Sequence, residues 1–329
     1  MLKRICCLIL AALMTAALAA CGDGDPEPTG QASTSAGTTA AAPHTVSADT
    51  EPVTEEPTEA PGSGSLDLKG FIRAFDRTPQ MEEQVIHDAD GVTITAAALR
   101  YDSIRGAAVM LRAENDSEQD LLIQADTCAV NGYMVKAELS LSVKAGKEAE
   151  GEMYIPYASL ALAGASAVST VEFTLILVDQ SNYEVSCTCE PACLQTTAVP
   201  EGETYEPVYE ADGQTVYDDK GIRIALKGVD RGRQISEYPA LVVCIHNGSD
   251  RAISVQAGSM LVNGYEMTST MTATVLPGKG AVDLVEIFDM DLDEYGIEEI
   301  ETVELRFRVV DEKTWEKIAE TDTVLVEEE

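Results

Sequence analysis

Basic residues are scarce in this chain of 329 residues. Only 22 Lys and Arg stand against 57 Asp and Glu, which gives a formal net charge of −35. A phosphate backbone would be repelled over most of such a surface, so we expect no nucleic-acid partner. Acidic chains are often disordered, but a hydrophobic content of 45% indicates that the charge coats real cores.

Residues that usually carry catalysis are also few. The chain has three His, and neither a Gly-rich phosphate loop nor a Gly-x-Ser-x-Gly elbow occurs. His87 and His246 do not occupy matching positions in the repeat described below, and no cysteine has an evident His partner in the sequence. We therefore expect no enzyme, no catalytic residue and no cofactor.

No apolar run reaches the length of a comfortable membrane span. The first residues, "MLKRICCLILAALMTAALAAC", place Lys3 and Arg4 before an apolar run from Ile5 to Leu18, as in an export signal. Leu18-Ala19-Ala20-Cys21 resembles the lipobox of bacterial lipoproteins. That resemblance implies a signal peptide over 1–21 and a fatty-acyl (palmitate-type) anchor on Cys21, holding the chain at the extracytoplasmic face of the cell membrane. The alternative is an ordinary signal peptide followed by a coincidental cysteine.

The next segment, residues 22–65, lacks Lys, Arg and aromatic residues. It consists mostly of Thr, Ala, Pro, Ser, Gly and acidic residues, which cannot build a packed core. We predict a disordered stalk there, followed by a lead-in over 66–82 with helix-like apolar spacing at 66–75.

An internal repeat fills the rest of the chain. Asn131-Gly132-Tyr133 recurs as Asn263-Gly264-Tyr265, a shift of 132 positions, and "VEFTLILVD" (171–179) falls on "VELRFRVVD" (303–311) at the same shift. Upstream, "VIHDADGVTI" (85–94) matches "TVYDDKGIRI" (215–224) at a shift of 130. We predict two copies, at 83–197 and 215–329, joined by an acidic, proline-containing linker over 198–214.

Within each copy, apolar residues alternate with polar ones, as in half-buried strands. The alternation buries Val171, Phe173, Leu175 and Leu177 in the first copy and Val303, Leu305, Phe307 and Val309 in the second. Asn131-Gly132 and Asn263-Gly264 supply the positive φ angles of a two-residue hairpin turn. The predicted fold is all-β, with two tandem immunoglobulin-like sandwiches and a single helical turn in each copy at 157–168 and 289–300.

The combination of a lipobox, a Thr/Pro/Glu stalk and repeats carrying "VNGY" and a closing "VEFTLILVD" or "VELRFRVVD" is similar to one bacterial group. It resembles the largely uncharacterised clostridial-type, Gram-positive surface lipoproteins with Ig-like domains. The resemblance covers about residues 80–329 and supports the fold. It supplies no catalytic residues.

Two candidate chemistries remain. Asp289, Asp291 and Asp293 are spaced like the start of a calcium loop, but Glu294 and Ile300 stand where that loop needs Gly and a bidentate Glu. We therefore expect a solvated acidic connection and no metal. Five cysteines follow the lipobox, Cys128, Cys187, Cys189, Cys193 and Cys244. The run "CTCEPAC" (187–193) suggests a soft metal site, but the sequence has no second Cys or His cluster to complete four ligands. The cysteines are therefore expected to pack as small apolar side chains, or to form one disulfide involving Cys187, Cys189 or Cys193.

The expected role is non-catalytic binding or presentation at the cell surface. The membrane would be contacted through the N-terminal lipid, and the sandwiches would contact an extracellular protein, a glycan or a cell-wall polymer. The alternative is an accessory or spacer subunit of an envelope system for transport, sensing or wall assembly.

Overall fold

The structure is a computed structural model that describes residues 66–209 and 213–327. The predicted signal peptide, Cys21 and the stalk lie outside the described residues. Across the two described ranges, none of the helices has the length and apolar character needed to cross a membrane.

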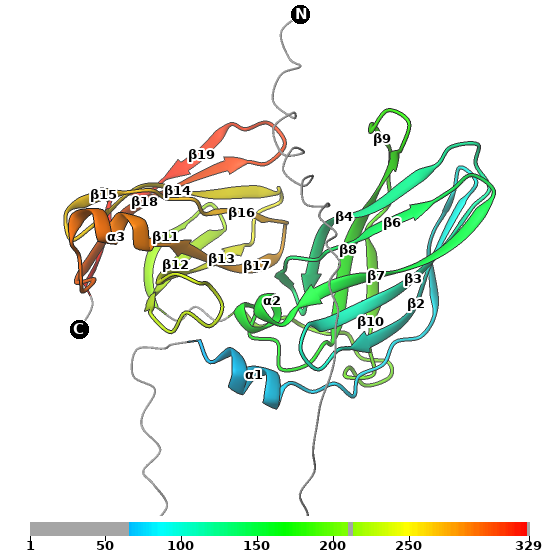
Figure 1. Cartoon of the computed structure of the whole chain (residues 1–329), viewed down its shortest axis with the longest axis horizontal. Coiled ribbons are helices and arrows are strands. Elements are labelled where there is room, and N and C mark those ends of the chain that lie inside the picture. Colours follow the sequence, from blue (N-terminus) through cyan, green and yellow to red (C-terminus); the bar gives the residue numbers. More distant parts are fainter. Residues whose placement is uncertain (1–65, 210–212, 328–329) are drawn as a thin grey trace, which may run out of the picture. The chain divides into compact units, whose positions relative to one another are not determined.

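The first copy consists of short strands and two short helices (Figure 1). Its elements are α1 (Leu68–Ala74), β1 (Gln84–Ala89), β2 (Val92–Tyr101), β3 (Gly106–Asn115), β4 (Leu121–Val130), β5 (Tyr133–Met134), β6 (Ser140–Val143), β7 (Lys147–Pro156), α2 (Tyr157–Leu162), β8 (Thr170–Asp179), β9 (Val185–Thr188) and β10 (Ala192–Gln195). The helix expected within 66–75 is α1, and the helical turn expected after 157 is α2.

The second copy repeats this order, apart from a counterpart of α1. Its elements are β11 (Gln214–Asp219), β12 (Ile222–Asp230), β13 (Ala240–Asn247), β14 (Ile253–Val262), β15 (Tyr265–Met267), β16 (Thr272–Val275), β17 (Lys279–Glu286), α3 (Asp289–Tyr295), β18 (Thr302–Asp311), β19 (Lys317–Glu320) and β20 (Val324–Glu327). From β4 onward, every element starts 132 positions before its counterpart. The duplication read from the turns is therefore a duplication of the whole fold unit.

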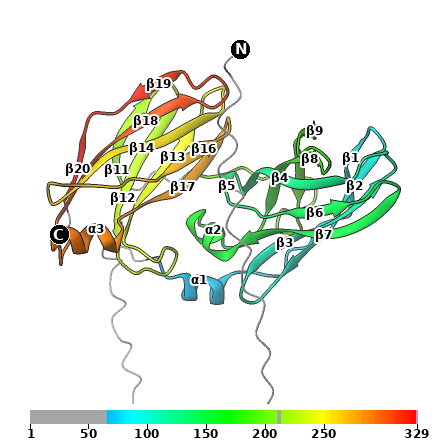
Figure 2. The same cartoon turned by 45° about the horizontal axis from the view of Figure 1, so that its top comes forward.

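Each copy is an immunoglobulin-like β-sandwich. In the first, the sheet β1-β2-β3-β7 faces strands β10, β8, β4 and β5, with β6 and β9 attached to β4 and β8. In the second, β11, β12, β13 and β17 face β15, β14 and β18, to which β16, β19 and β20 attach. Figure 2 shows β14 beside β18, and β13 beside β17. Helices α2 and α3 each carry the chain from one sheet to the other.

Two separate hydrophobic cores fill the sandwiches, as the alternating pattern predicts. The first contains Val171, Phe173, Leu175 and Leu177, all at most 3% exposed. The second contains Val303, Leu305, Phe307 and Val309, all 0% exposed. At about 25 cal/mol per Å² of buried apolar surface, these inward faces supply the main stabilisation of each sheet pair. The all-β prediction is confirmed.

Helix α1 is held against the first sandwich by aromatic packing. Phe71 and Phe75 each make edge contacts with the ring of Tyr157, at centroid distances of 6.3 and 5.3 Å. Arg77 donates a hydrogen bond of 2.7 Å from Nε to the Tyr157 hydroxyl, and its guanidinium lies 5.2 Å from the centre of that ring. The first described helix is therefore anchored to the first sandwich.

The two copies touch through a short strand pairing. Strand β5 pairs in parallel with β17, matching Tyr133 with Gly280, and the Gly280 N–H donates to the Gly132 carbonyl at 3.0 Å. Tyr209, in the predicted linker, stacks on His246 at 4.3 Å. A Cβ on Gly280 would lie 2.8 Å from the Tyr209 ring and 2.9 Å from the Tyr133 ring. Only glycine fits this contact without displacement.

Candidate metal centre

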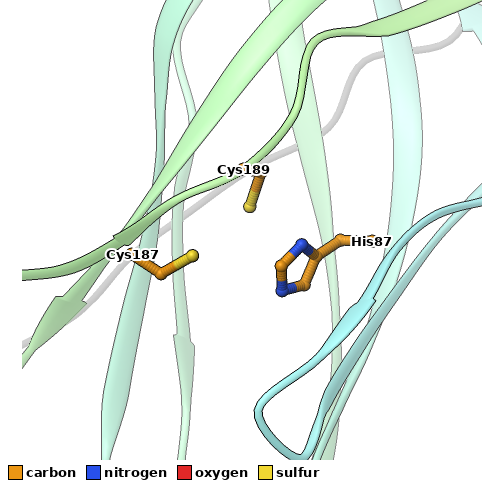
Figure 3. A group of neighbouring side chains, drawn as sticks. All are labelled: His87, Cys187 and Cys189. Atoms are coloured by element: carbon orange, nitrogen blue, oxygen red, sulfur yellow. The ribbon is translucent and has the colours of Figure 1, made fainter.

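One nitrogen and two sulfur ligands meet at an edge of the first sandwich. His87 lies on β1, which ends the sheet β1-β2-β3-β7, and Cys187 lies on β9, which is attached to β8 in the opposite sheet. Cys189 follows β9 directly and lies two positions beyond Cys187. Residues two apart on a strand point to the same side. Figure 3 shows both cysteine side chains directed toward the His87 imidazole.

The potential ligand atoms of these residues lie within 4.8 Å of one another. Cys189 is buried, while Cys187 and His87 are half-buried. Burial, together with the neighbouring Cys187, raises the pKa of the Cys189 thiol to about 12. The His87 Nε2 is buried and has no hydrogen-bond partner in the described chain. A buried ring nitrogen of this kind calls for a partner, and a metal ion is one that satisfies it.

The second copy builds the same backbone with different side chains. Tyr217, Ala319 and Thr321 occupy the positions of His87, Cys187 and Cys189. The β-bulge before His87 recurs before Tyr217, and the bulge in the β8–β9 pairing recurs in the β18–β19 pairing. Because the scaffold forms without them, packing alone does not require a His and two Cys at this edge.

This donor set suits a thiophilic metal ion. Thiolate sulfur and imidazole nitrogen are the ligands of zinc sites, and two Cys with one His form a three-ligand zinc set that leaves a position for an outside ligand. Copper(I) also accepts soft thiolates. Among the described residues, no carboxylate joins the group, so calcium and magnesium, which take oxygen ligands, are a poor match.

The sequence-based expectation that no cysteine has a His partner is wrong. His87 and Cys187 are 100 positions apart, and they meet because β1 and β9 are edge strands on the same side of one sandwich. Contact across an edge leaves no periodic signal along the chain. The available hints were the Cys-x-Cys spacing, which places two thiols on one face, and the exchange of His87 for Tyr217 between otherwise matching strands.

The aspartates considered for calcium are not brought together. Asp289, Asp291 and Asp293 lie on helix α3, and among the described residues only the His87 group gathers three potential ligands. Asp289 accepts two hydrogen bonds from Arg233, at 2.7 and 2.6 Å, and that guanidinium lowers the pKa of the carboxyl. Asp291 accepts from the Thr268 N–H at 3.1 Å. Asp289 and Asp291 therefore hold α3 to neighbouring segments of the second sandwich.

The duplicated Asn-Gly turns lie at matching places. Asn131 (φ 53°) and Gly132 (φ 84°) join β4 to β5, and Asn263 (φ 49°) and Gly264 (φ 83°) join β14 to β15. Each Asn side chain also reaches the start of the last long strand: the Asn131 oxygen accepts from the Thr170 N–H at 3.1 Å, and the Asn263 oxygen accepts from the Thr302 N–H at 3.0 Å. The turn thus fixes both a hairpin and a distant strand.

The remaining cysteines lie away from this centre. Cys128 and Cys244 are buried on β4 and β13, and Cys193 is exposed on β10. No disulfide links any of the five cysteines in the described ranges. Burial raises the pKa of Cys128 to about 12 and also raises that of Cys193. High thiol pKa values do not favour a nucleophilic role for these two residues.

Comparisons with known proteins add little. No protein-family model and no curated protein matches the chain. Among solved structures, the YadV chaperone is 11% identical to this chain, with a TM-score of 0.22, and the match covers 67% of this chain and 92% of the chaperone chain. A chain of the Salmonella enterica SafA pilin–SafB chaperone complex is 13% identical, with a TM-score of 0.19, and the match covers 67% of this chain and 89% of that chain. Likeness at this level carries no argument about function.

Proposed function

We propose that this protein is a lipid-anchored, non-catalytic protein of the extracytoplasmic membrane face whose first sandwich binds a thiophilic metal ion of the zinc class. The observation that carries the metal-binding part is the convergence of His87, Cys187 and Cys189 on a scaffold that forms equally well without them. The anchoring part is supported by the basic start, the short apolar run and Leu18-Ala19-Ala20-Cys21.

The ligands would act in distinct ways. Both cysteines bind as thiolates, so the metal displaces a proton from the Cys189 thiol, which burial holds protonated at neutral pH. His87 binds as the neutral imidazole through its buried Nε2. Two thiolates and a divalent ion give a neutral complex, which suits a site where Cys189 is only 5% exposed.

Metal stoichiometry tests this assignment. The reduced protein is expected to retain about one Zn²⁺ per chain in equilibrium dialysis, and Co²⁺ in its place should give both a thiolate-to-cobalt charge-transfer band and the intense visible bands of a tetrahedral site. Binding without a charge-transfer band would place the metal elsewhere. If Cys187 or Cys189 reacts with a thiol reagent only after a reductant is added, that residue is instead held in a disulfide, the alternative considered from the sequence.

The anchor has a separate test. Replacing Cys21 by Ala removes the only thiol that the lipobox offers for acylation. We expect the Cys21→Ala protein to lose metabolic lipid labelling and to move from the membrane fraction into the soluble fraction, with metal binding unchanged. A matched Cys7→Ala change, inside the predicted signal peptide, should leave labelling intact. Continued labelling of Cys21→Ala would contradict the anchor.

A further inference from the structure

A cavity of about 830 Å³ opens where the second sandwich meets the first copy. Its lining comes from β16, β17 and the segment before β13, and from β4, β5 and α2 of the first copy. Part of the wall is apolar and is formed by Met134, Leu162, Ile235 and Met271. Cavities of this size at the contact between two domains are common binding sites for small molecules.

The charged side chains of this cavity are mostly acidic. Among the described residues that line it, four are carboxylates, Asp126, Asp283, Glu286 and Glu312, and one is basic, Lys136. At three of the acidic positions the first copy has uncharged residues: Gly151, Tyr154 and Gln180 stand in place of Asp283, Glu286 and Glu312. The sandwich fold therefore does not require an acidic residue at any of these three positions.

Asp283 lies in a space that the first copy fills with an apolar side chain. Ala281, two positions earlier on β17, belongs to the hydrophobic core, and residues two apart on a strand point to the same side. In the first copy, a Cβ on Gly151 would lie only 3.1 Å from the side chain of Leu141. The second copy has Ala273 in place of Leu141, and the smaller side chain leaves room for the carboxylate of Asp283.

The Asp283 carboxylate is half-buried and has few partners. Its Oδ1 accepts a hydrogen bond of 2.9 Å from the adjacent Leu284 N–H. Burial raises the pKa of this carboxyl. The charge of the exposed Lys136 opposes that shift, but no ion pair joins Lys136 to Asp283 within the described ranges. A half-buried carboxylate beside a cavity is stabilised by a cation that enters the cavity.

Glu312 replaces an amide that donates two hydrogen bonds in the first copy. There, Gln180 Nε2 donates to the Leu121 carbonyl at 2.8 Å and to the Ser142 hydroxyl at 2.6 Å. An ionised carboxylate has no proton to donate. Glu312 Oε2 is buried, and it has no hydrogen-bond partner in the described part of the chain. A buried oxygen of this kind calls for a donor, and an ammonium group offers three N–H donors.

We propose that this cavity binds a linear alkyl diamine or polyamine, one molecule per chain. Its ammonium groups pair with Asp283 and Glu312, and its methylene chain packs on the apolar wall that contains Met134 and Met271. A divalent metal ion is a poorer occupant, because among the described residues these carboxylates do not form a group of three close ligands. This inference does not depend on the metal centre at His87.

The first test uses spermidine as the probe and the full-length protein. In isothermal titration calorimetry at physiological salt, spermidine should bind saturably, with one molecule per chain. Spermidine that is methylated to a quaternary ammonium at every nitrogen keeps its positive charges but loses its N–H donors. Because Glu312 Oε2 needs a donor, the methylated compound should bind about tenfold more weakly.

Variants of the two carboxylates locate the site. Glu312→Gln installs the residue that the first copy carries at this position, so the fold should be kept, and spermidine should bind about tenfold more weakly. Asp283→Asn should have a similar effect and provides a second, independent measurement. The control Glu298→Gln makes the same change in charge at an exposed position outside the cavity, and it should bind spermidine like wild type.

Four results would overturn the proposal. Spermidine binding that does not saturate, or that is weakened equally by Glu298→Gln and by the cavity variants, would show only attraction to the net charge of −35. Equal binding of the methylated compound would remove the role of the N–H donors. Displacement of spermidine by an equal concentration of Ca²⁺ would show that the cavity is a metal site.

Discussion

Zinc should stop stabilising the protein when His87→Tyr, Cys187→Ala and Cys189→Thr are combined. These changes install the residues that the second copy carries at the same positions, Tyr217, Ala319 and Thr321. A ligand at a hundred times its Kd stabilises the native state by about 2.7 kcal/mol, so the wild-type first sandwich should melt roughly 10 °C higher with Zn²⁺. The triple variant should show no metal-dependent shift in calorimetry.

The same variant should fold normally without metal. Thr321 Oγ1 accepts a hydrogen bond of 2.9 Å from the Phe307 N–H, and a threonine at position 189 can accept from Leu175 in the same way because Cys189 already pairs its backbone N–H with the Leu175 carbonyl. We expect a change below about 1 kcal/mol in the metal-free protein. A large loss of stability without metal would show that the three residues are needed for packing, and the metal assignment would then lose its main support.

Asn247→Ala should be among the most destabilising single changes. Asn247 is 0% exposed, and its Nδ2 donates 2.8 Å bonds to the Arg251 and Val275 carbonyls. Its Oδ1 accepts from Ser249, at 3.1 Å from the N–H and 2.6 Å from the hydroxyl. Losing these four bonds of a fully buried side chain should cost about 3–5 kcal/mol, measured as a lower midpoint in urea denaturation.

The first copy offers an independent repeat of this measurement. Asn115 makes the same four bonds, to Gln119, Val143 and twice to Ser117. Asn115→Ala should therefore cost about as much as Asn247→Ala. Ser249→Ala removes a half-buried hydroxyl that contacts Asn247 Oδ1 at 2.6 Å and the Arg251 carbonyl at 3.3 Å, and it should cost about 1 kcal/mol or less. A loss under 1 kcal/mol for both asparagines would contradict the assigned structural role.

Those two asparagines show how far local sequence reasoning reaches. Their Asn-x-Ser pattern and position after a strand indicate a turn, and each does form one. Each side chain also donates to a distant strand. Asn115 donates to the Val143 carbonyl of β6, and Asn247 donates to the Val275 carbonyl of β16, both 28 positions away. Sequence spacing gives the turn, but it does not give a long-range partner.

The sequence by itself determined the repeat, the strand faces and the hairpin turns. Each of these is a local property: an alternating pattern fixes which residues point inward, Asn-Gly supplies positive φ, and equal spacing keeps the two copies in register. The meeting of His87, Cys187 and Cys189 was decided only by the tertiary structure. His87 and Cys187 meet because two sheets close over one core. Contacts across sheet edges depend on how strands are assembled, and strand assembly leaves no period in the chain.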